Sequence, residues 1–295
     1  MAGESVRLVF AGDFGANDAA NDTLSMISGL APEALFVVGD LSYGQIRPEV
    51  AWCGYVLDRV GASVAVQLVV GNHEADGGDG GWIGDYAECL PDRVGSSGEY
   101  PLQYYSDFAT KVRVVAIAPG LSVKGREFNY APGSEDRRWL EQTVAEGRSH
   151  GLWIIVAHHK VCISAAEKTC EVSEELANWE AANADIVMMG HAHNYQRSHQ
   201  LRCVRADRVV SGCIADADGV HLAGQGAVFV IAGIAGRHRP LHPGDSEADY
   251  FAATMGEGSD VWGHGVVVVE ATDQLLVGNF VGSDTPYSDG FRIGR

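Results

Sequence analysis

The chain has 295 residues, of which 46% are hydrophobic and 20% charged, and its formal net charge is −18. Repulsion at this charge argues against a nucleic acid partner, but a small phosphorylated substrate stays compatible because bound dications can reverse the local sign. No run of ~18 apolar residues could span a bilayer, so no membrane partner is expected. Residues 1–5 lack the basic and apolar start of a secretion signal, which predicts a cytoplasmic protein, or a secreted one if a leader has been removed.

The first third of the chain alternates between predicted strands and helices. Apolar runs at 6–11, 35–38 and 64–70 are typical of buried strands, and residues 17–30 and 48–60 are typical of helices. Strands separated by helices at this spacing predict a parallel sheet with right-handed crossovers. Each of these strands ends in Gly-Asp or Gly-Asn, at the carboxyl edge where open α/β sheets place their sites.

The rest of the chain begins with a glycine-rich segment, 75–101, which predicts a long loop. After it the pattern predicts strands at 111–118, 152–157 and 185–189, and helices at 134–146, capped by Ser134, and at 171–182. The pattern then becomes β-rich, with strands at 227–232, 265–270 and 275–281. One domain over residues 1–295 with two packed sheets fits these elements best.

Five short clusters of metal-binding residues follow these predicted strands. They are Asp13, Asp40 with Tyr43, Asn72-His73, His158-His159, and His191 with His193. One such cluster is more often a turn or a helix cap, but five in order, about one βα unit apart, converge if consecutive strands lie side by side. Oxygen and imidazole ligands suit two metal ions that share a carboxylate, which is an arrangement used to hydrolyse phosphate esters.

The ordered motifs GDxG, GDxxY, GNHE, a strand-ending His and GHxH resemble those of the calcineurin-like metallophosphoesterase superfamily, and most of all the purple acid phosphatases. Gly15 stands where most of the superfamily has histidine, and Tyr43 supplies the missing ligand, as in purple acid phosphatases. Residues 190–197 match GHxHxYxR, and residues 288–293 resemble the final strand of the family. The fibronectin-like N-terminal domain of the larger plant enzymes is not seen. The resemblance implies an α/β fold, a four-layer α-β-β-α sandwich of two mixed sheets.

The resemblance also implies a set of metal ligands. The first ion, Fe(III), would be held by Asp13, Asp40, Tyr43 and His193; the second, Fe(II), Zn(II) or Mn(II), by Asn72, His158 and His191, with Asp40 bridging. A phenolate-containing site favours a hard trivalent ion, and an imidazole-rich site favours a divalent one, which independently supports this division. A metal-bound hydroxide would then hydrolyse a phosphate monoester without a phosphoenzyme.

Three further residues are expected at the substrate. His73 would contact the phosphate or protonate the leaving group, with Glu74 orienting it, and so act in catalysis together with Asp40. We expect His158, where the strand ends, to be the ligand, which leaves His159 to face the pocket or pack behind it. Lys168 lies near the position of a substrate-binding histidine of the family, where it could bind an anion or be a surface lysine.

A basic loop at 236–242 contains His238 and His242. Beside a metal centre it could recognise a phosphate or carboxylate, but a solvated loop that balances nearby acids is the favoured interpretation. Six cysteines are present, and Cys53/Cys89, Cys162/Cys170 and Cys203/Cys213 are plausible local pairs, although many pairings and unpaired thiols stay open.

Two alternatives to a monoesterase remain. A phosphodiesterase or nucleotide pyrophosphatase could use the same scaffold, and turnover of a diester would separate it from a monoesterase. A metal-free binding platform would be expected to have lost ligands, and all seven proposed positions carry a ligating residue. The sequence indicates no oligomeric state.

Overall fold

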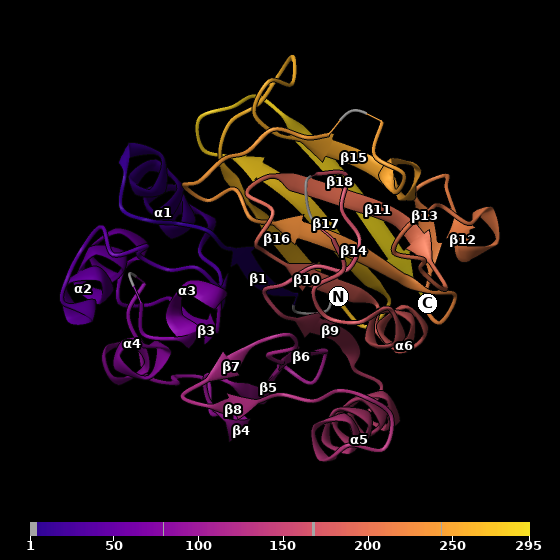
Figure 1. The fold of residues 1–295 in the computed structure, drawn as a ribbon, viewed down its shortest axis with the longest axis horizontal. Helices are drawn as coiled ribbons and strands as arrows, with labels where there is room; N and C mark the ends of the chain where they lie inside the picture. The colour runs from indigo at the N-terminus through magenta and orange to yellow at the C-terminus, as the bar shows by residue number, and fades with distance from the viewer. Residues whose placement is uncertain (1–4, 79, 167–168, 243) are drawn as a thin grey trace.

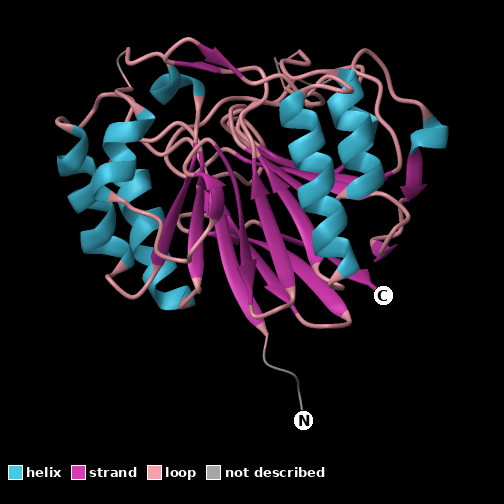
Figure 2. Cartoon of the chain, turned by 90° about the horizontal axis from the view of Figure 1, so that it is seen from below, coloured by secondary structure: helices cyan, strands magenta, loops and turns pink. Residues whose placement is uncertain are grey.

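A computed structural model describes residues 5–78, 80–166, 169–242 and 244–295. Two large mixed sheets lie face to face, and helices cover the outer side of each (Figures 1 and 2). The order from one side to the other is helices, sheet, sheet, helices, so the predicted α/β sandwich of two mixed sheets is confirmed.

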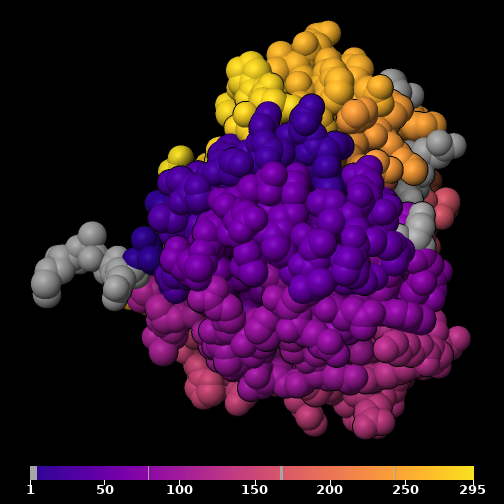
Figure 3. All heavy atoms as spheres, turned by 90° about the vertical axis from the view of Figure 1, so that its left-hand side faces the viewer, coloured from indigo at the N-terminus to yellow at the C-terminus, as the bar shows by residue number. Residues whose placement is uncertain are grey.

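The first sheet contains the N-terminal parallel strands and the C-terminal antiparallel ones. Its order is β13 (Val220–Leu222), β18 (Ser288–Gly294), β17 (Leu275–Gly282), β16 (Gly265–Ala271), β1 (Val6–Ala11), β2 (Ala34–Val38) and β3 (Ala65–Val69). The strands β1, β2 and β3 are parallel neighbours, as the sequence predicts. Helices α1 (Asp18–Leu30), α2 (Glu49–Val60), α3 (Asn72–Ala75) and α4 (Ile83–Cys89) belong to this half. In Figure 3 these N-terminal segments, indigo and purple, cover the face that carries α1 and α2, with C-terminal segments in orange and yellow beside them.

The second sheet is built from the middle of the chain. Its order is β12 (Ile214–Asp216), β11 (Tyr195–Leu201), β14 (Ala227–Ala232), β10 (Ile186–Met189), β9 (Trp153–Ala157), β6 (Val112–Ala116), β5 (Gln103–Phe108) and β4 (Ser97–Glu99), and β15 (Phe251–Met255) pairs with β11. Helices α5 (Glu135–Ser149) and α6 (Glu174–Asn183) lie on its outer face. A small hairpin, β7 (Ser122–Val123) with β8 (Arg126–Glu127), lies above it in Figure 2, and two 3₁₀ turns span Ser211–Cys213 and Ala248–Tyr250.

Strand periodicity divides the buried side chains between two apolar layers. In β1, Leu8 and Phe10 belong to the layer between the sheets, whereas Val9 and Ala11 pack under the helices. In β9, Trp153, Ile155 and Ala157 point between the sheets and Ile154 and Val156 point toward the helices. Burial on both faces explains why these strands read as continuous apolar runs rather than alternating ones.

The predicted helices and strands are confirmed within a few residues of their ends. The side chains of Asn17, Ser134 and Ser173 each accept a hydrogen bond from the backbone at the start of a helix, which fixes where α1, α5 and α6 begin. The helix predicted at 171–182 therefore starts later, at Glu174.

Two of the differences from the sequence prediction are informative. The segment 75–101 is not all loop, because it contains α4 and β4. The strand β11 was not predicted because its sequence, YQRSHQL, is polar. Its residues Gln196, Ser198 and Gln200 are fully buried and hydrogen-bonded, for example Gln196 Nε2 to Ser164 Oγ at 2.9 Å. Hydrogen bonding thus allows a polar strand inside the sheet.

All six cysteines are paired, and the three local pairs are the ones that form: Cys53–Cys89, Cys162–Cys170 and Cys203–Cys213. The first bond ties α2 to α4. Among the described residues, no helix is both long enough and apolar enough to cross a membrane.

Candidate metal centre

The loops that follow the parallel strands of both sheets meet at one edge of the sandwich. Asp13 follows β1, Asp40 follows β2 and Asn72 opens α3 after β3, while the fourth and fifth motifs follow β9 and β10. These strand ends lie on the side of Figure 2 where the loops gather. The carboxyl ends of two sheets thus form one site, as expected for parallel strands.

The backbone at this site adopts an unusual conformation. Five of the proposed ligands have positive φ values: Asp13 (61°), Asp40 (56°), Tyr43 (52°), His191 (71°) and His193 (53°). Left-handed backbone at residues other than glycine costs about 1–3 kcal/mol each and gathers at functional sites. Because five such residues lie in three loops, we infer that these loops accept a less stable backbone in order to position the side chains of the proposed ligands.

One group of side chains surrounds the Tyr43 hydroxyl. This oxygen lies 2.9 Å from Asp13 Oδ1, 3.0 Å from Asp40 Oδ2 and 2.9 Å from His193 Nε2. The His193 Nε2 atom also lies 3.1 Å from Asp13 Oδ1. We call Asp13, Tyr43 and His193, together with Asp40, the phenol cluster.

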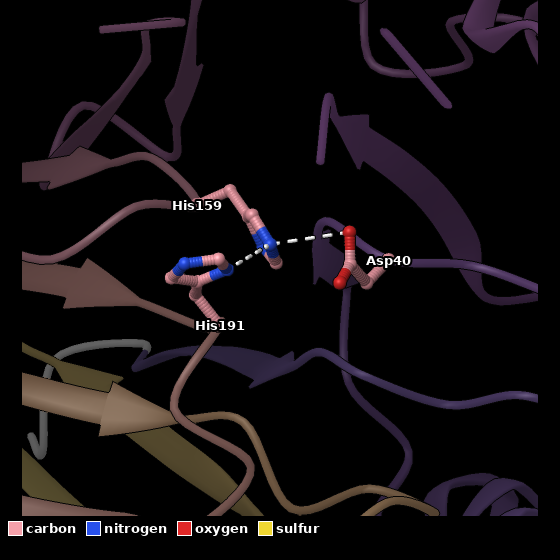
Figure 4. A group of neighbouring side chains, drawn as sticks. All are labelled: Asp40, His159 and His191. Atoms are coloured by element: carbon pink, nitrogen blue, oxygen red, sulfur yellow. Dashed lines mark hydrogen bonds and ion pairs between the residues drawn. The ribbon is translucent and has the colours of Figure 1, made fainter. Parts of the chain in front are cut away.

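A second group surrounds the Nε2 atom of His159. It lies 3.1 Å from Asp40 Oδ1 and 3.2 Å from His191 Nδ1, as Figure 4 shows. It also lies 3.1 Å from Asn72 Oδ1. We call Asn72, His159 and His191, together with Asp40, the imidazole cluster. Asp40 belongs to both clusters: the ligand atoms of Asp40, His159 and His191, and those of Asp13, Asp40 and His193, lie within 4.8 Å of one another.

The structure places His159, and not the predicted ligand His158, among the candidate ligands. His158 points out of the site: its Nδ1 lies 2.7 Å from the carbonyl oxygen of Lys160 and its Nε2 lies 3.2 Å from Glu180 Oε1 of α6. Successive residues of an extended chain face opposite sides. His158 continues the helix-facing residues of β9, whereas His159 continues those that point between the sheets, where its Nδ1 lies 2.8 Å from the Val38 oxygen of the other sheet.

Glycines before the motifs allow this close approach. A Cβ at Gly39, whose φ is 85°, would lie 2.3 Å from Nδ1 of His159, and a Cβ at Gly71 would lie 2.2 Å from the Asp40 backbone nitrogen. Both distances are impossible for a larger residue, so packing requires glycine at both positions, and at Gly39 the positive φ favours glycine as well.

The protein's own groups already compensate the buried carboxylates. Burial alone would raise the pKa of Asp40, but the charge and hydrogen bond of His159, together with His73, hold that pKa well below its usual range. Burial would lower the pKa of His159, but Asp40 outweighs it and raises that pKa to about 9. Burial, with Asp13 and Asp40, raises the pKa of the Tyr43 phenol far above its ordinary value.

The buried carboxylates need positively charged or proton-donating partners. A cation in each cluster would replace the proton of Tyr43 or His159 as the partner of the carboxylates, so metal binding would release protons. Carboxylate, phenol, carboxamide and imidazole donors fit two hard or borderline ions that share Asp40. The residues present therefore fit a dinuclear centre.

Glu74 supports the site in a way that differs from the prediction. It is fully buried, and its carboxyl oxygens accept hydrogen bonds from the backbone nitrogens of Asp40 (3.1 Å), Leu41 (2.6 Å) and Gly71 (3.3 Å). Burial and the charge of Asp40 raise the pKa of Glu74 to about 8. Glu74 thus joins the loops after β2 and β3 through backbone contacts.

His73 lies on the open side of the shared carboxylate. Its side chain is 29% exposed, its Nε2 lies 3.8 Å from Asp40 Oδ2, and its ring centroid lies 4.4 Å from that of Tyr43. This position can reach a molecule bound above Asp40. The predicted substrate contact at Lys168 lies outside the described residues.

Two contacts near the site were not predicted, although Arg237 belongs to the basic loop noted in the sequence. Glu171 Oε1 lies 2.8 Å from His191 Nε2, and Glu171 Oε2 lies 3.1 Å from Lys160 Nζ. The bond to His191 lowers the pKa of Glu171, and a carboxylate acceptor at Nε2 leaves the His191 Nδ1 lone pair facing the cluster. Arg237 places its guanidinium 4.4 Å from the centroid of the Tyr43 ring. The sequence carries no signal for either contact beyond the residue types.

Comparison with known proteins agrees with this geometry. The chain is 23% identical over 228 residues to purple acid phosphatase 15 of Arabidopsis thaliana (66% of this chain, 41% of that protein), and 26% identical over 238 residues to a nucleotide pyrophosphatase/phosphodiesterase of Hordeum vulgare (70% and 58%). It therefore spans about half the length of these curated relatives. A purple acid phosphatase from yellow lupin seeds shares the fold, with a TM-score of 0.74 and 19% identity over 99% of this chain and 54% of that one.

The sequence profile of the calcineurin-like phosphoesterases matches residues 6–195, which is the stretch that contains all the proposed ligands. Membership implies a metal-dependent phosphoesterase fold, and in each of two groups the structure brings candidate ligand atoms to within 4.8 Å of one another. The chain belongs to the calcineurin-like phosphoesterase family, with purple acid phosphatases among its relatives.

Proposed function

We propose that this protein hydrolyses phosphate monoesters at a dinuclear metal centre of the purple acid phosphatase type. The observation that carries the proposal is the position of Asp40, whose two carboxyl oxygens face different clusters: Oδ1 lies 3.1 Å from His159 and Oδ2 lies 3.0 Å from Tyr43. A carboxylate shared in this way is what two neighbouring cations require. The apolar layer that both sheets share supports treating residues 1–295 as one catalytic domain.

The two clusters differ in the ion that each would hold. In the phenol cluster, Asp13, Tyr43 and His193 with Asp40 offer mainly anionic oxygens, which favour Fe(III). In the imidazole cluster, Asn72, His159 and His191 favour Zn(II), Mn(II) or Fe(II). When bound, the two ions would polarise a phosphoryl oxygen and lower the pKa of a water molecule.

The chain's own residues would bind and orient the substrate. His73 is exposed beside Asp40, so its imidazole can contact the phosphoryl group and donate a proton to the leaving oxygen. The carboxylates of Asp13 and Asp40 set the positions of the ions, while Glu74 fixes the backbone of Asp40. A small phosphorylated molecule is the partner that this arrangement supports.

A phosphodiesterase or nucleotide pyrophosphatase is the second candidate. The barley relative carries that name, and it matches 70% of this chain.

The three disulfides support a protein that works in an oxidising compartment, which favours the secreted alternative over the cytoplasmic one.

The test compares two aryl esters and one ligand variant. We expect the isolated protein to contain two metal ions per chain by elemental analysis and to release 4-nitrophenol faster from 4-nitrophenyl phosphate than from bis(4-nitrophenyl) phosphate. Asp40→Asn should lose both ions and at least about 1000-fold in kcat. Asp273→Asn, at an exposed position, is the control. Full turnover by Asp40→Asn would refute the proposal, and faster cleavage of the diester would favour the second candidate.

A further inference from the structure

A small cavity opens beside the phenol cluster. Its volume is about 190 Å³, and it is lined by Asn17, His193, Gly236, Arg237, His238 and Arg239. His193 is therefore shared between this cavity, which we call the arginine pocket, and the candidate metal centre. The lining loop is the basic segment for which the sequence favoured a solvated role.

The backbone of this loop is fixed to the proposed ligands. The carbonyl oxygen of Asp13 accepts hydrogen bonds from the Gly236 nitrogen (3.2 Å) and the Arg237 nitrogen (2.9 Å), and the carbonyl oxygen of His193 accepts one from the Arg239 nitrogen (2.8 Å). The loop therefore keeps its place relative to both ends of the phenol cluster. A binding group carried on it would be held in register with the reaction centre.

His238 Nε2 lies 4.0 Å from Glu257 Oε2, but the two arginines of the described loop lack such a partner. Among the described residues, neither Arg237 nor Arg239 has a carboxylate within ion-pair distance, in a chain whose net charge is −18. Arg237 instead lies over the Tyr43 ring, and Arg239 is exposed at the pocket. Two guanidinium groups that face a cavity without acidic partners are available to bind an anion.

The imidazole at the rim of the pocket is held in place by a chain of contacts. His238 Nδ1 lies 3.4 Å from His264 Nε2, and His264 Nδ1 lies 2.7 Å from Asp284 Oδ2. The His238 ring also packs against Trp262, with 5.1 Å between the centroids. This support positions His238 as a further polar group facing the cavity.

We propose that the arginine pocket binds a second phosphoryl group of a substrate whose first phosphoryl group is cleaved at the metal centre. The inference rests on the proposed function and narrows its substrate class to diphosphates and closely spaced bisphosphates. Guanidinium groups match phosphate oxygens in pairs, which makes phosphate the preferred anion. A volume of about 190 Å³ suits a phosphoryl group, whereas pockets for whole drug-sized ligands start at roughly 300 Å³.

The first test compares inorganic pyrophosphate with 4-nitrophenyl phosphate in the metal-loaded protein. We expect Arg239→Gln to raise KM for pyrophosphate at least about tenfold more than KM for the aryl ester. Arg202→Gln makes the same charge change at an exposed position at the far end of β11 and should leave the ratio of the two KM values as in the wild type. An equal change of both KM values in Arg239→Gln would overturn the proposal.

A second test does not depend on turnover. Calorimetry should show that the wild type binds methylenediphosphonate at least about tenfold more tightly than methylphosphonate, and that Arg239→Gln removes most of this difference. If neither pyrophosphate nor 4-nitrophenyl phosphate is hydrolysed, but the wild type shows this difference in affinity and Arg239→Gln loses it, the proposed function is wrong and the pocket assignment is supported. If methylenediphosphonate binds wild type and Arg239→Gln equally, the pocket assignment is wrong whatever the activity.

Discussion

The two halves of the candidate centre share Asp40 but are built differently. In the phenol cluster, Asp13, Tyr43 and His193 all have left-handed backbone and gather around a phenol oxygen. In the imidazole cluster, apart from the shared Asp40, only His191 has positive φ, and His159 reaches its place from the second sheet through a contact with the first. The phenol cluster is therefore set by tight turns and the imidazole cluster by the packing of the two sheets. This difference means that damage to each half should have a different signature.

The largest effect should come from the two adjacent histidines. His159→Ala removes a donor of the imidazole cluster, so we expect loss of one metal ion per chain and a fall in kcat of roughly 1000-fold. The matched variant His158→Ala lies behind the sheet, beside Glu180. It should keep both ions and instead lower the free energy of unfolding by about 1–3 kcal/mol, because it leaves a buried carboxylate without its partner. Elemental analysis and thermal unfolding distinguish the two, and the reversed pattern would restore His158 as the ligand.

A variant of His73 should affect neither half of the centre. We expect His73→Ala to lower kcat on 4-nitrophenyl phosphate by roughly 100-fold, since a positioned acid contributes about that much. Metal content should not change, and esters with better leaving groups should lose less. An equal loss for all leaving groups would contradict proton donation by His73.

The phenol cluster can be tested by its colour. If Tyr43 binds Fe(III), the oxidised protein should absorb visible light, and Tyr43→Phe should abolish the band and lower kcat about tenfold. The ring that packs against Arg237 is kept in this variant, so the pocket wall should survive. A colourless wild-type protein with full activity would assign a different ion to this half.

The smallest effect should come from the support of the imidazole cluster. Glu171→Gln keeps the shape of the side chain but weakens the acceptor at His191 Nε2, so the affinity for one ion should fall about tenfold. Metal titration of the protein after chelation would show one weakened site, while the visible band of the other half persists. Two equally weakened sites would mean that Glu171 does not act through His191 alone.

Much of this centre could be predicted from the sequence, for a physical reason. Asp13, Asp40 and Asn72 each follow an apolar run of a parallel strand, and parallel strands bring their carboxyl ends together. The spacing of Tyr43 from Asp40 likewise placed it in the same turn. The four-layer architecture was implied by the family resemblance, and the burial of the strands on both faces agrees with it.

The remaining features depend on packing that local sequence does not encode. His158 and His159 both follow β9, and only the face of the strand decides between them. The buried strand β11 is polar, because its side chains find hydrogen-bond partners elsewhere in the chain. The loop around Arg237 looked solvated because its attachment to Asp13 is made by backbone atoms.

The left-handed turns at the site also limit which replacements are informative. Alanine or a β-branched residue at Asp13, Asp40 or His193 would both delete a donor and resist the required φ, by roughly 1–2 kcal/mol. Asparagine and glycine tolerate that conformation, so they would separate the loss of a ligand from a collapse of the loop. Alanine variants at these positions would therefore overstate the contribution of the lost side chains to catalysis. Evolutionary substitutions there should be limited to the few residue types that tolerate a left-handed backbone.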